Sequence, residues 1–347
     1  QAVVGIKLPL LRGLLIDERR TRLFQARNLA NLNLAGGDEM RNEVLFDATQ
    51  AYWDWYYANQ SLEIIENAII ISDQRFQAVK DGYFAGDKPA IDTVEALIQL
   101  QTWQLQRQDA QVKLNKATLN LSNFLWTEEG VPMQIAFEST PGTISEDPAS
   151  TLETINITEQ GNWVSSHPSI RKYNFKQKEL EYERRWKKEQ FKPQLDLEYN
   201  LLGNGLQFQD NASNIPFYNN YKWGATFSFP LFLRKVSGGY EMAQLKLLDN
   251  DLKRSQKELE LENKINQITT ELQNLQAQYG NFSSMVANYE RMYEGEREKF
   301  AIGESSLFLI NSRETKLLEN RLKLLKLETE IFKTRNKLLW AGGRLVP

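Results

Sequence analysis

The sequence contains 347 residues, of which 25% are charged, with a formal net charge of −3, one histidine and no cysteine. This length suits one to three ordinary domains, and the charge balance gives no electrostatic basis for nucleic-acid binding. The lack of cysteine excludes disulfides, thiolate nucleophiles and cysteine-ligated metals. The longest aliphatic run, AIII at Ala68 to Ile71, is far shorter than the roughly 20 apolar residues of a membrane-spanning helix.

The first segment, residues 1–12, alternates apolar and polar side chains. Ile6 and Leu8 fall on one side of the alternation, and Gly5 and Lys7 on the other. This period of two predicts a β-strand. The alternation starts at once and no signal peptide is visible, so we expect the natural product to begin upstream.

Residues 13–126 predict a helical hairpin. A helix over about residues 13–84 would be roughly 108 Å long, and Gly86 predicts the turn that ends it. WDWYY at 53–57 could suggest a ligand cage, but its place on this helix favours packing. The helix carries a seam with steps of four and three, typical of supercoiled helices: Val44, Ala48, Ala51, Trp55, Ala58, Leu62, Ile65, Ile69, Ser72, Phe76, Val79 and Tyr83.

Residues 127–152 are rich in proline and predict a crossover segment. Residues 153–191 predict a helix that leads to a second pair of strands, with a helix start at His167-Pro168. We interpret His167 as a surface or capping residue, because a lone histidine cannot supply a multi-histidine metal site. No metal is therefore expected.

Residues 192–232 predict a β-hairpin with a polar external loop at 203–220. Strands of about 9 to 11 residues with a period of two are typical of transmembrane β-barrels. A half-buried sheet in a soluble protein alternates in the same way, so this alternative stays open. The candidate lipid-facing residues are Leu195, Leu197, Tyr199, Leu201, Tyr221, Trp223, Phe227 and Phe229.

Residues 233–341 predict a second helical hairpin, followed by a tail at 342–347. Gly303 suits the left-handed residue just past a helix end, and Ser305 is the expected N-cap of a return helix starting near Leu307. A second seam again alternates steps of three and four: Ile265, Ile268, Leu272, Leu275, Tyr279, Phe282, Val286, Tyr289 and Tyr293.

The two halves of the chain repeat each other. LPLLRG at 8–13 and FPLFLR at 229–234 each precede a long proline-free helix and a glycine turn. Pro9 lies 77 positions before Gly86, and Pro230 lies 73 positions before Gly303. This order of landmarks predicts an internal duplication.

The strands suggest an oligomer, because open sheet edges cannot lie in lipid and a barrel closes only if several chains contribute strands. Strands that continue into coiled-coil hairpins would form one tube with polar faces lining water. The glycine turns lie where such a tube narrows, and carboxylate or aromatic rings there could filter or block a pore. The aperture candidates are Asp92, Glu304, Phe300 and Tyr83. The alternative is that they are helix caps and packing aromatics.

These motifs, together with SHPSIRKYNFKQKELEYERRWKKEQFKPQLDLEYNL at 166–201, make the sequence resemble the TolC-like outer-membrane efflux proteins over essentially its whole length. The resemblance implies a homotrimer in the outer membrane of a Gram-negative bacterium. It implies a twelve-stranded β-barrel in lipid, a periplasmic α-barrel and an equatorial belt. It also implies docking of the Gly86 and Gly303 turns to a periplasmic adaptor, with an inner-membrane transporter as a further partner.

The sequence departs from the family pattern in two ways. It has three predicted strands where the family has four. The family often places aspartates after both turns; Asp92 follows the first, but Leu309 and Ser312 stand at the corresponding positions of the second. Cation selectivity by that second acidic ring is therefore not expected.

We expect a mainly helical, internally duplicated protein with a small β part, acting as a passive duct for efflux or type I secretion. The alternative is a soluble coiled-coil scaffold with a small sheet, which would have no use for a one-sided apolar band on its strands. No catalytic triad or nucleotide-binding loop is present in the sequence. We therefore expect neither enzymatic activity nor a cofactor.

Overall fold

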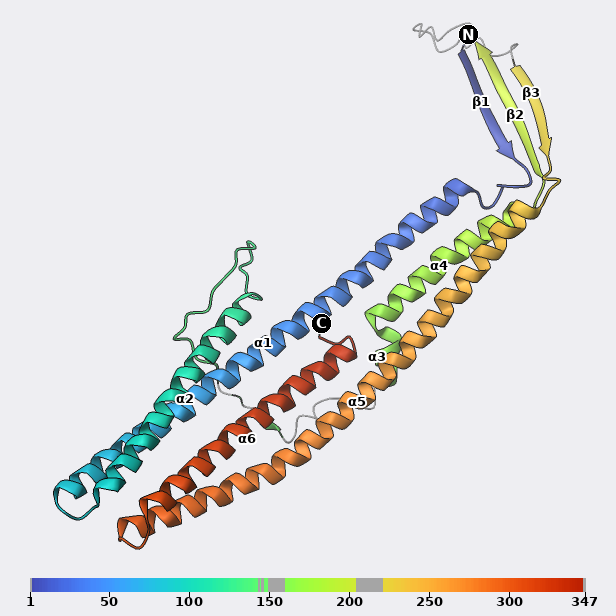
Figure 1. The fold of residues 1–347 in the computed structure, drawn as a ribbon. Coiled ribbons are helices and arrows are strands. Elements are labelled where there is room, and N and C mark those ends of the chain that lie inside the picture. The colour runs from blue at the N-terminus through green and yellow to red at the C-terminus, as the bar shows by residue number, and fades with distance from the viewer. Residues whose placement is uncertain (1, 143, 145–146, 149–159, 204–220, 346–347) are drawn as a thin grey trace. The chain divides into compact units, whose positions relative to one another are not determined.

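The computed structural model describes residues 2–142, 144, 147–148, 160–203 and 221–345. Most of the predicted external loop, from residue 204 on, lies outside these ranges. The protein is mainly helical with one small sheet, as the sequence predicts (Figure 1). In chain order the elements are β1 (Ala2–Pro9), α1 (Glu18–Phe84), α2 (Ala90–Ser122), α3 (Gln160–Ser166), α4 (Pro168–Glu189), β2 (Gln194–Gly203), β3 (Tyr221–Ser228), α5 (Arg234–Ala301) and α6 (Leu307–Ala341).

The chain divides into two compact units. The first, called the strand unit here, comprises residues 1–39 and 165–260. The second, called the hairpin unit, comprises residues 40–164 and 261–347. Among the helices of the described ranges, none has the length and apolarity needed to span a membrane.

The strand unit contains a three-stranded antiparallel sheet in the order β1-β2-β3. Beside it, α4 packs between the first part of α1 and the first part of α5. The ring of Phe24 on α1 stacks on Tyr182 of α4 at 4.8 Å between centroids. Asn250 of α5 donates its side-chain amide to the Tyr173 carbonyl of α4 at 3.2 Å. A hydrogen bond and a pair of stacked rings therefore connect α4 to α5 and to α1.

Helix α4 begins where the sequence predicts. Pro168 is its first residue, and the extended backbone of His167 before it follows from the steric restriction that proline imposes. The His167 Nδ1 atom accepts a hydrogen bond from the Ser169 N–H at 3.2 Å. The capping interpretation of His167 is thus confirmed, but the side chain is buried and not a surface residue.

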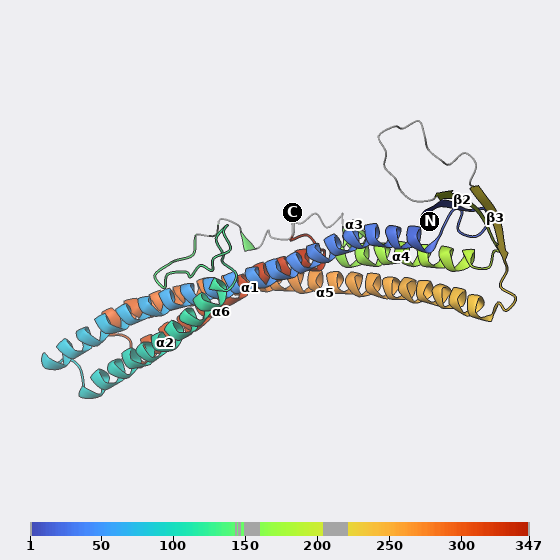
Figure 2. The same cartoon turned by 90° about the horizontal axis from the view of Figure 1, so that it is seen from above.

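The hairpin unit contains two helical hairpins, the second part of α1 with α2 and the second part of α5 with α6 (Figures 1 and 2). Trp53 of α1 stacks on Phe332 of α6 at 4.6 Å, which confirms that the aromatic run at 53–57 serves packing. Trp103 of α2 is buried with Ala68 of α1 and Leu318 of α6. Helix α6 therefore contacts both helices of the other hairpin.

The predicted seams are buried over most of their length. On α1 the seam is enclosed from Ala51 to Val79, while its ends, Val44 and Tyr83, are exposed. On α5 the residues Leu272 and Val286 are buried in the same manner. The heptad period thus identified the faces that helices cover within the chain.

Two helix starts differ from the prediction. Helix α1 starts at Glu18, not near residue 13, because Asp17 caps it: its Oδ1 atom accepts the Arg20 N–H at 2.7 Å. Helix α6 is capped by Ser306, whose Oγ atom accepts the Leu309 N–H at 3.3 Å. The prediction of Ser305 as this cap was wrong, because the Ser305 hydroxyl instead bonds to Glu296.

Candidate functional site

One face of the sheet is apolar and exposed. Cross-strand partners place Ile6 beside Tyr199 and Tyr199 beside Trp223 in one row, and Leu8 beside Leu197 in the next. The rings of Tyr199 and Tyr221 stack at 5.9 Å. Of the predicted lipid-facing set, Leu195 is half-buried, Leu201 is described only by its pairing with Val4 and Tyr221, and the rest are exposed: Leu197, Tyr199, Tyr221, Trp223, Phe227 and Phe229.

The opposite face of the sheet is polar. Lys7 of β1 forms ion pairs with Asp196 at 2.9 Å and with Glu198 at 3.0 Å, both on β2. Gly5 leaves room for Asn200, whose Oδ1 atom would lie 1.9 Å from any Cβ atom at residue 5. A side chain at residue 5 would therefore displace Asn200. The sheet separates an exposed apolar surface from a charged and hydrogen-bonded one.

The two predicted turns have the same backbone geometry. Gly86 (φ +83°) and Gly303 (φ +80°) both adopt the left-handed conformation that favours glycine. The Gly86 N–H bonds to the Tyr83 carbonyl and the Asp87 N–H to the Gly82 carbonyl. Gly303 and Glu304 bond to the carbonyls of Phe300 and Lys299 in the same pattern. Both turns are Schellman motifs, which end a helix by satisfying its last carbonyl groups.

The aperture candidates lie around these turns, which meet each other. The Lys88 Nζ atom in the first turn lies 5.0 Å from the centre of the Phe300 ring beside the second. Phe300 is partly buried against the core, whereas Tyr83 and Glu304 are exposed. Asp92 is half-buried in the first turn of α2, where a carboxylate also interacts favourably with the helix dipole. The structure thus brings the four residues to one end of the hairpin unit.

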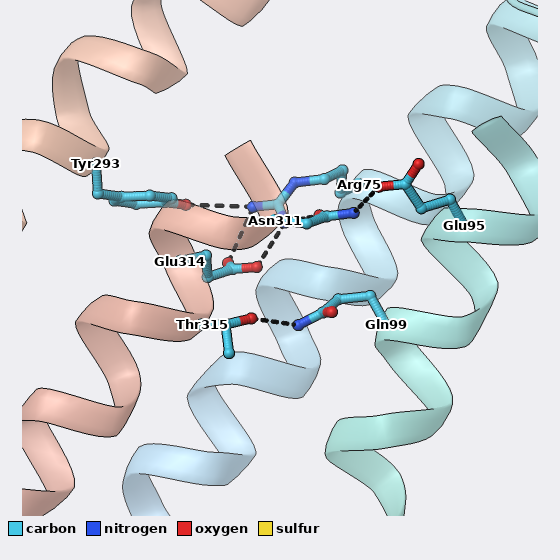
Figure 3. Close-up of polar contacts among 7 residues, drawn as sticks. All are labelled: Arg75, Glu95, Gln99, Tyr293, Asn311, Glu314 and Thr315. Carbon is cyan, nitrogen blue, oxygen red and sulfur yellow. Dashed lines mark hydrogen bonds and ion pairs between the residues drawn. The ribbon is translucent and has the colours of Figure 1, made fainter. Parts of the chain in front are cut away.

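A buried polar network connects helices of the two hairpins (Figure 3). The Arg75 guanidinium of α1 binds both carboxylate oxygens of Glu314 on α6, at 2.5 and 2.9 Å. The same guanidinium donates to Asn311 at 2.9 Å and to the Tyr293 hydroxyl of α5 at 3.3 Å. Asn311 in turn donates to Glu95 of α2 at 3.4 Å. The network joins α1, α2, α5 and α6.

Burial of Arg75 opposes its charged form, but the contacts with Glu314 and Tyr293 outweigh burial and raise the pKa of Arg75 above its ordinary value. This network was not predicted from the sequence. One signal was available: Glu314 falls between Ile310 and Leu317 in the apolar period of α6, and a charge at such a position requires a partner.

In the ranges that the structure describes, no three or more histidine, aspartate or glutamate side chains form a group that could hold an ion.

Comparisons with known proteins identify a family and a fold for this chain. A family model described as "Outer membrane efflux protein" matches residues 162–344, just over half of the chain. No curated protein matches the sequence.

Solved structures of outer-membrane proteins share the fold. The Campylobacter jejuni CmeC outer membrane channel is 14% identical, with a TM-score of 0.68 over 99% of this chain and 76% of that chain. The outer membrane protein VceC of Vibrio cholerae is 14% identical, with a TM-score of 0.69 over 99% and 86%. The open state of the Neisseria gonorrhoeae MtrE outer membrane channel is 12% identical, with a TM-score of 0.71 over 99% and 79%.

At these identities the structural matches establish the fold alone, whereas the family match extends over residues that include the second strand pair and the second helical hairpin. The chain therefore belongs to the outer membrane efflux protein family and is an efflux channel of the outer membrane.

Proposed function

We propose that three copies of this chain form a passive duct through which an inner-membrane transporter, working with a periplasmic adaptor, exports its substrates. The apolar, exposed face of the β1-β2-β3 sheet carries this proposal. Such a face suits lipid, and the charged face behind it suits a water-filled lumen. Because the duct supplies neither catalysis nor energy, the transporter drives export.

The sheet supports an oligomer. It has three strands in the described residues, and the unpaired backbone groups at its two edges could not remain in lipid. A barrel that closes by adding the same strands from neighbouring chains would satisfy these groups. In this proposal, residues 1–12 and 192–232 contribute to the barrel.

The hairpins support the same assembly. Residues 13–126 and 233–341 would form the periplasmic helical wall, with residues 127–152 as the crossover, 153–191 as the helix before the second strands and 342–347 as a tail. Helix α2 carries a further apolar stripe, with steps of three, four and seven, that nothing in the described chain covers. Its exposed members, which suit packing against a neighbouring chain, are Ile91, Val94, Ile98, Leu105, Val112 and Leu119.

The two halves would descend from a duplicated unit. The strand-end motifs at 8–13 and 229–234 support this origin, as do the identical hydrogen-bond patterns at Gly86 and Gly303. Two copies of the same unit would place their equivalent turns at the same end of the tube.

The turns around Gly86 and Gly303 would dock the adaptor. Exposed apolar side chains there include Phe84, Ile302 and Phe308. Rings of Asp92, Glu304, Phe300 and Tyr83 would border the aperture in the trimer. Replacing Asp92 by Asn should lower the preference for cations in planar-bilayer conductance. An unchanged preference would assign Asp92 to helix capping alone.

A pair of adjacent substitutions on β3 tests the membrane assignment. Phe227 lies on the apolar face of the sheet and Thr226 on the polar face, so Phe227→Arg and Thr226→Arg place the same charge on opposite sides. An arginine facing lipid costs up to about 2–4 kcal/mol at the bilayer midplane and less towards the interfaces. We expect Phe227→Arg to reduce outer-membrane insertion and Thr226→Arg to leave it unchanged. Equal insertion of both variants would refute the lipid-facing assignment.

A further inference from the structure

Two short segments connect the sheet to the long helices and expose large apolar side chains. Residues 10–15 join β1 towards α1, and residues 229–233 join β3 to α5. We name their exposed apolar side chains the junction collar: Leu11, Leu14, Leu15, Leu231, Phe232 and Leu233. Leu231 is 83% exposed and Phe232 88%, more than Trp223 at 72% on the sheet face. The junction collar thus contains some of the most exposed apolar side chains of the strand unit.

The backbone holds the first segment firmly in place. The Leu10 N–H bonds to the Leu195 carbonyl at 2.8 Å, and the Arg12 N–H to the Pro193 carbonyl at 3.2 Å, so pairing with the β2 side continues past the end of β1. Gly13 then turns the chain with φ +86°. The Arg20 side chain binds the Leu14 carbonyl. The exposed leucines are therefore displayed on a fixed framework.

The second segment places an apolar residue at a helix start, where a polar cap is usual. The Leu233 carbonyl accepts the first helical hydrogen bond of α5, from the Ser237 N–H at 2.7 Å, so Leu233 occupies the N-cap position. Serine, threonine, aspartate or asparagine at an N-cap stabilises a helix more than an apolar residue does, because the side-chain oxygen accepts a hydrogen bond from a free backbone N–H. Helix α1, in contrast, uses Asp17 there. Helix stability does not account for a leucine at this position.

Basic residues follow the apolar ones directly. Arg234 and Lys235 come after Leu233, and both are exposed. No acidic side chain in the described ranges forms an ion pair with either of them. An apolar segment bordered by free basic side chains matches the boundary between acyl chains and phosphate headgroups of a bilayer.

We propose that the junction collar is an interfacial lipid anchor, whose apolar side chains enter the acyl boundary of the inner leaflet while Arg234 and Lys235 bind lipid phosphates. The collar continues the apolar sheet face, since Phe229 and Leu231 follow Phe227 with the same period. Irregular backbone cannot enter the hydrocarbon core, which limits the segment to the interface. This inference rests on the proposed function of the sheet.

Single cysteines test the anchor, because the chain has none of its own. The full chain, spin-labelled at Phe232→Cys, is placed in nanodiscs of phosphatidylcholine. Relaxation by lipid-soluble oxygen and by a water-soluble nickel complex then reports immersion. Trp223→Cys provides the label on the sheet face, and Ser255→Cys, on an exposed position of α5, provides the label in water.

We expect oxygen to relax the residue-232 label severalfold more than the residue-255 label, and less than the residue-223 label. If the label at residue 232 is relaxed by oxygen no more than the label at residue 255, while the label at residue 223 lies in lipid, the anchor is overturned and the duct proposal stays intact. A label at 232 shielded from both reagents also overturns it, because a protein interface then covers the collar. If the label at residue 223 itself lies in water, the lipid assignment of the sheet fails, and the anchor proposal fails with it.

The role of the charges has its own test. In an equimolar mixture of phosphatidylcholine and anionic phosphatidylglycerol, the label at 232 should lie deeper than in phosphatidylcholine alone. The double substitution Arg234→Gln and Lys235→Gln should abolish this difference. A depth that ignores lipid charge in the unmodified chain would overturn phosphate binding by these two residues.

Discussion

Arg75 and Glu314 are separated by 239 positions in the sequence, yet they form a two-point ion pair with side chains only 9% and 3% exposed. The pair connects α1 of the first hairpin to α6 of the second. Removing two charges from water is costly, and the pair offsets this cost only through its short bonds and its further contacts with Asn311 and Tyr293. Its integrity therefore matters more than that of the many exposed pairs on the helices.

The first prediction concerns this pair. Arg75→Ala or Glu314→Ala should lower the free energy of unfolding by about 3–5 kcal/mol, because each leaves a buried charge without a partner. Thermal unfolding of the detergent-purified protein, followed by circular dichroism, measures the loss. The combined change Arg75→Met and Glu314→Leu should recover most of it, since no buried charge remains.

The matched control is the exposed pair of Arg107 and Glu66, at 2.9 Å. Arg107→Ala should cost at most about 1 kcal/mol, because exposed ion pairs contribute little. Equal losses for Arg75→Ala and Arg107→Ala would show that burial does not set the strength of the pair.

The second prediction concerns the turn at Gly303. Its φ of +80° is disfavoured for any residue with a Cβ atom, although nothing would clash with that atom. Gly303→Ala should therefore destabilise the protein by about 1–2 kcal/mol. Gly280→Ala, on an exposed face inside α5, should instead stabilise by about 0.5–1 kcal/mol. Thermal midpoints that move in the same direction for both variants would contradict the assigned turn geometry.

The third prediction concerns close packing at the end of α6. A Cβ atom on Gly342 would lie 2.5 Å from the Trp163 ring, while the backbone there, with φ −86°, accepts any residue. Gly342→Ala should lower the thermal midpoint through this clash alone. In a Trp163→Ala background the same change should have almost no effect, and a double-mutant cycle of the midpoints measures the coupling. A cost that persists without the tryptophan ring would locate the cause elsewhere.

The fourth prediction is a pair of opposite pH dependences. Burial opposes ionisation of Glu39, but bonds from Lys172 and Ser169, at 2.7 Å each, outweigh it and lower the pKa of Glu39. Its contribution to stability is therefore present above the unfolded pKa, about 4.3, and is lost as the pH falls through the lower folded value. Burial raises the pKa of Glu328, so its ionised form at neutral pH weakens the fold.

At neutral pH, Glu39→Gln should lower the thermal midpoint and Glu328→Gln should raise it. The Glu328→Gln difference should shrink as the pH falls towards the unfolded pKa of about 4.3, whereas the Glu39→Gln difference should shrink only below that value, as the pH falls through the lowered folded pKa of Glu39. A series of thermal scans between about pH 3 and pH 8 covers both windows and checks both signs. Two shifts of the same sign would contradict the assigned environments.

The sequence predicted those features that depend on the periodicity of neighbouring residues. The seam from Ala51 to Val79, the glycines at the two turns and the two faces of the strands all follow from residues close together in the chain. The pairing of Arg75 with Glu314 could not be predicted, because no local pattern specifies which of many charged helix residues meet. The choice of Ser306 over Ser305 as a cap depends on backbone angles that two adjacent serines do not reveal.

The candidate site was predictable to the same extent. Alternation along 221–229 identified the residues of the apolar sheet face, and Gly86 and Gly303 identified the end of the hairpin unit. The close packing of Trp163 on Gly342 was not predictable, because it joins two segments through a missing side chain.

The most direct test of the trimeric duct is electron cryo-microscopy of the full-length protein, purified from outer membranes in detergent. We predict a threefold hollow cylinder, with Tyr199 and Trp223 on the outside of a closed barrel and with Gly86 and Gly303 at the far end of the helices. Monomers, or an assembly in which Trp223 faces an aqueous lumen, would contradict the proposal.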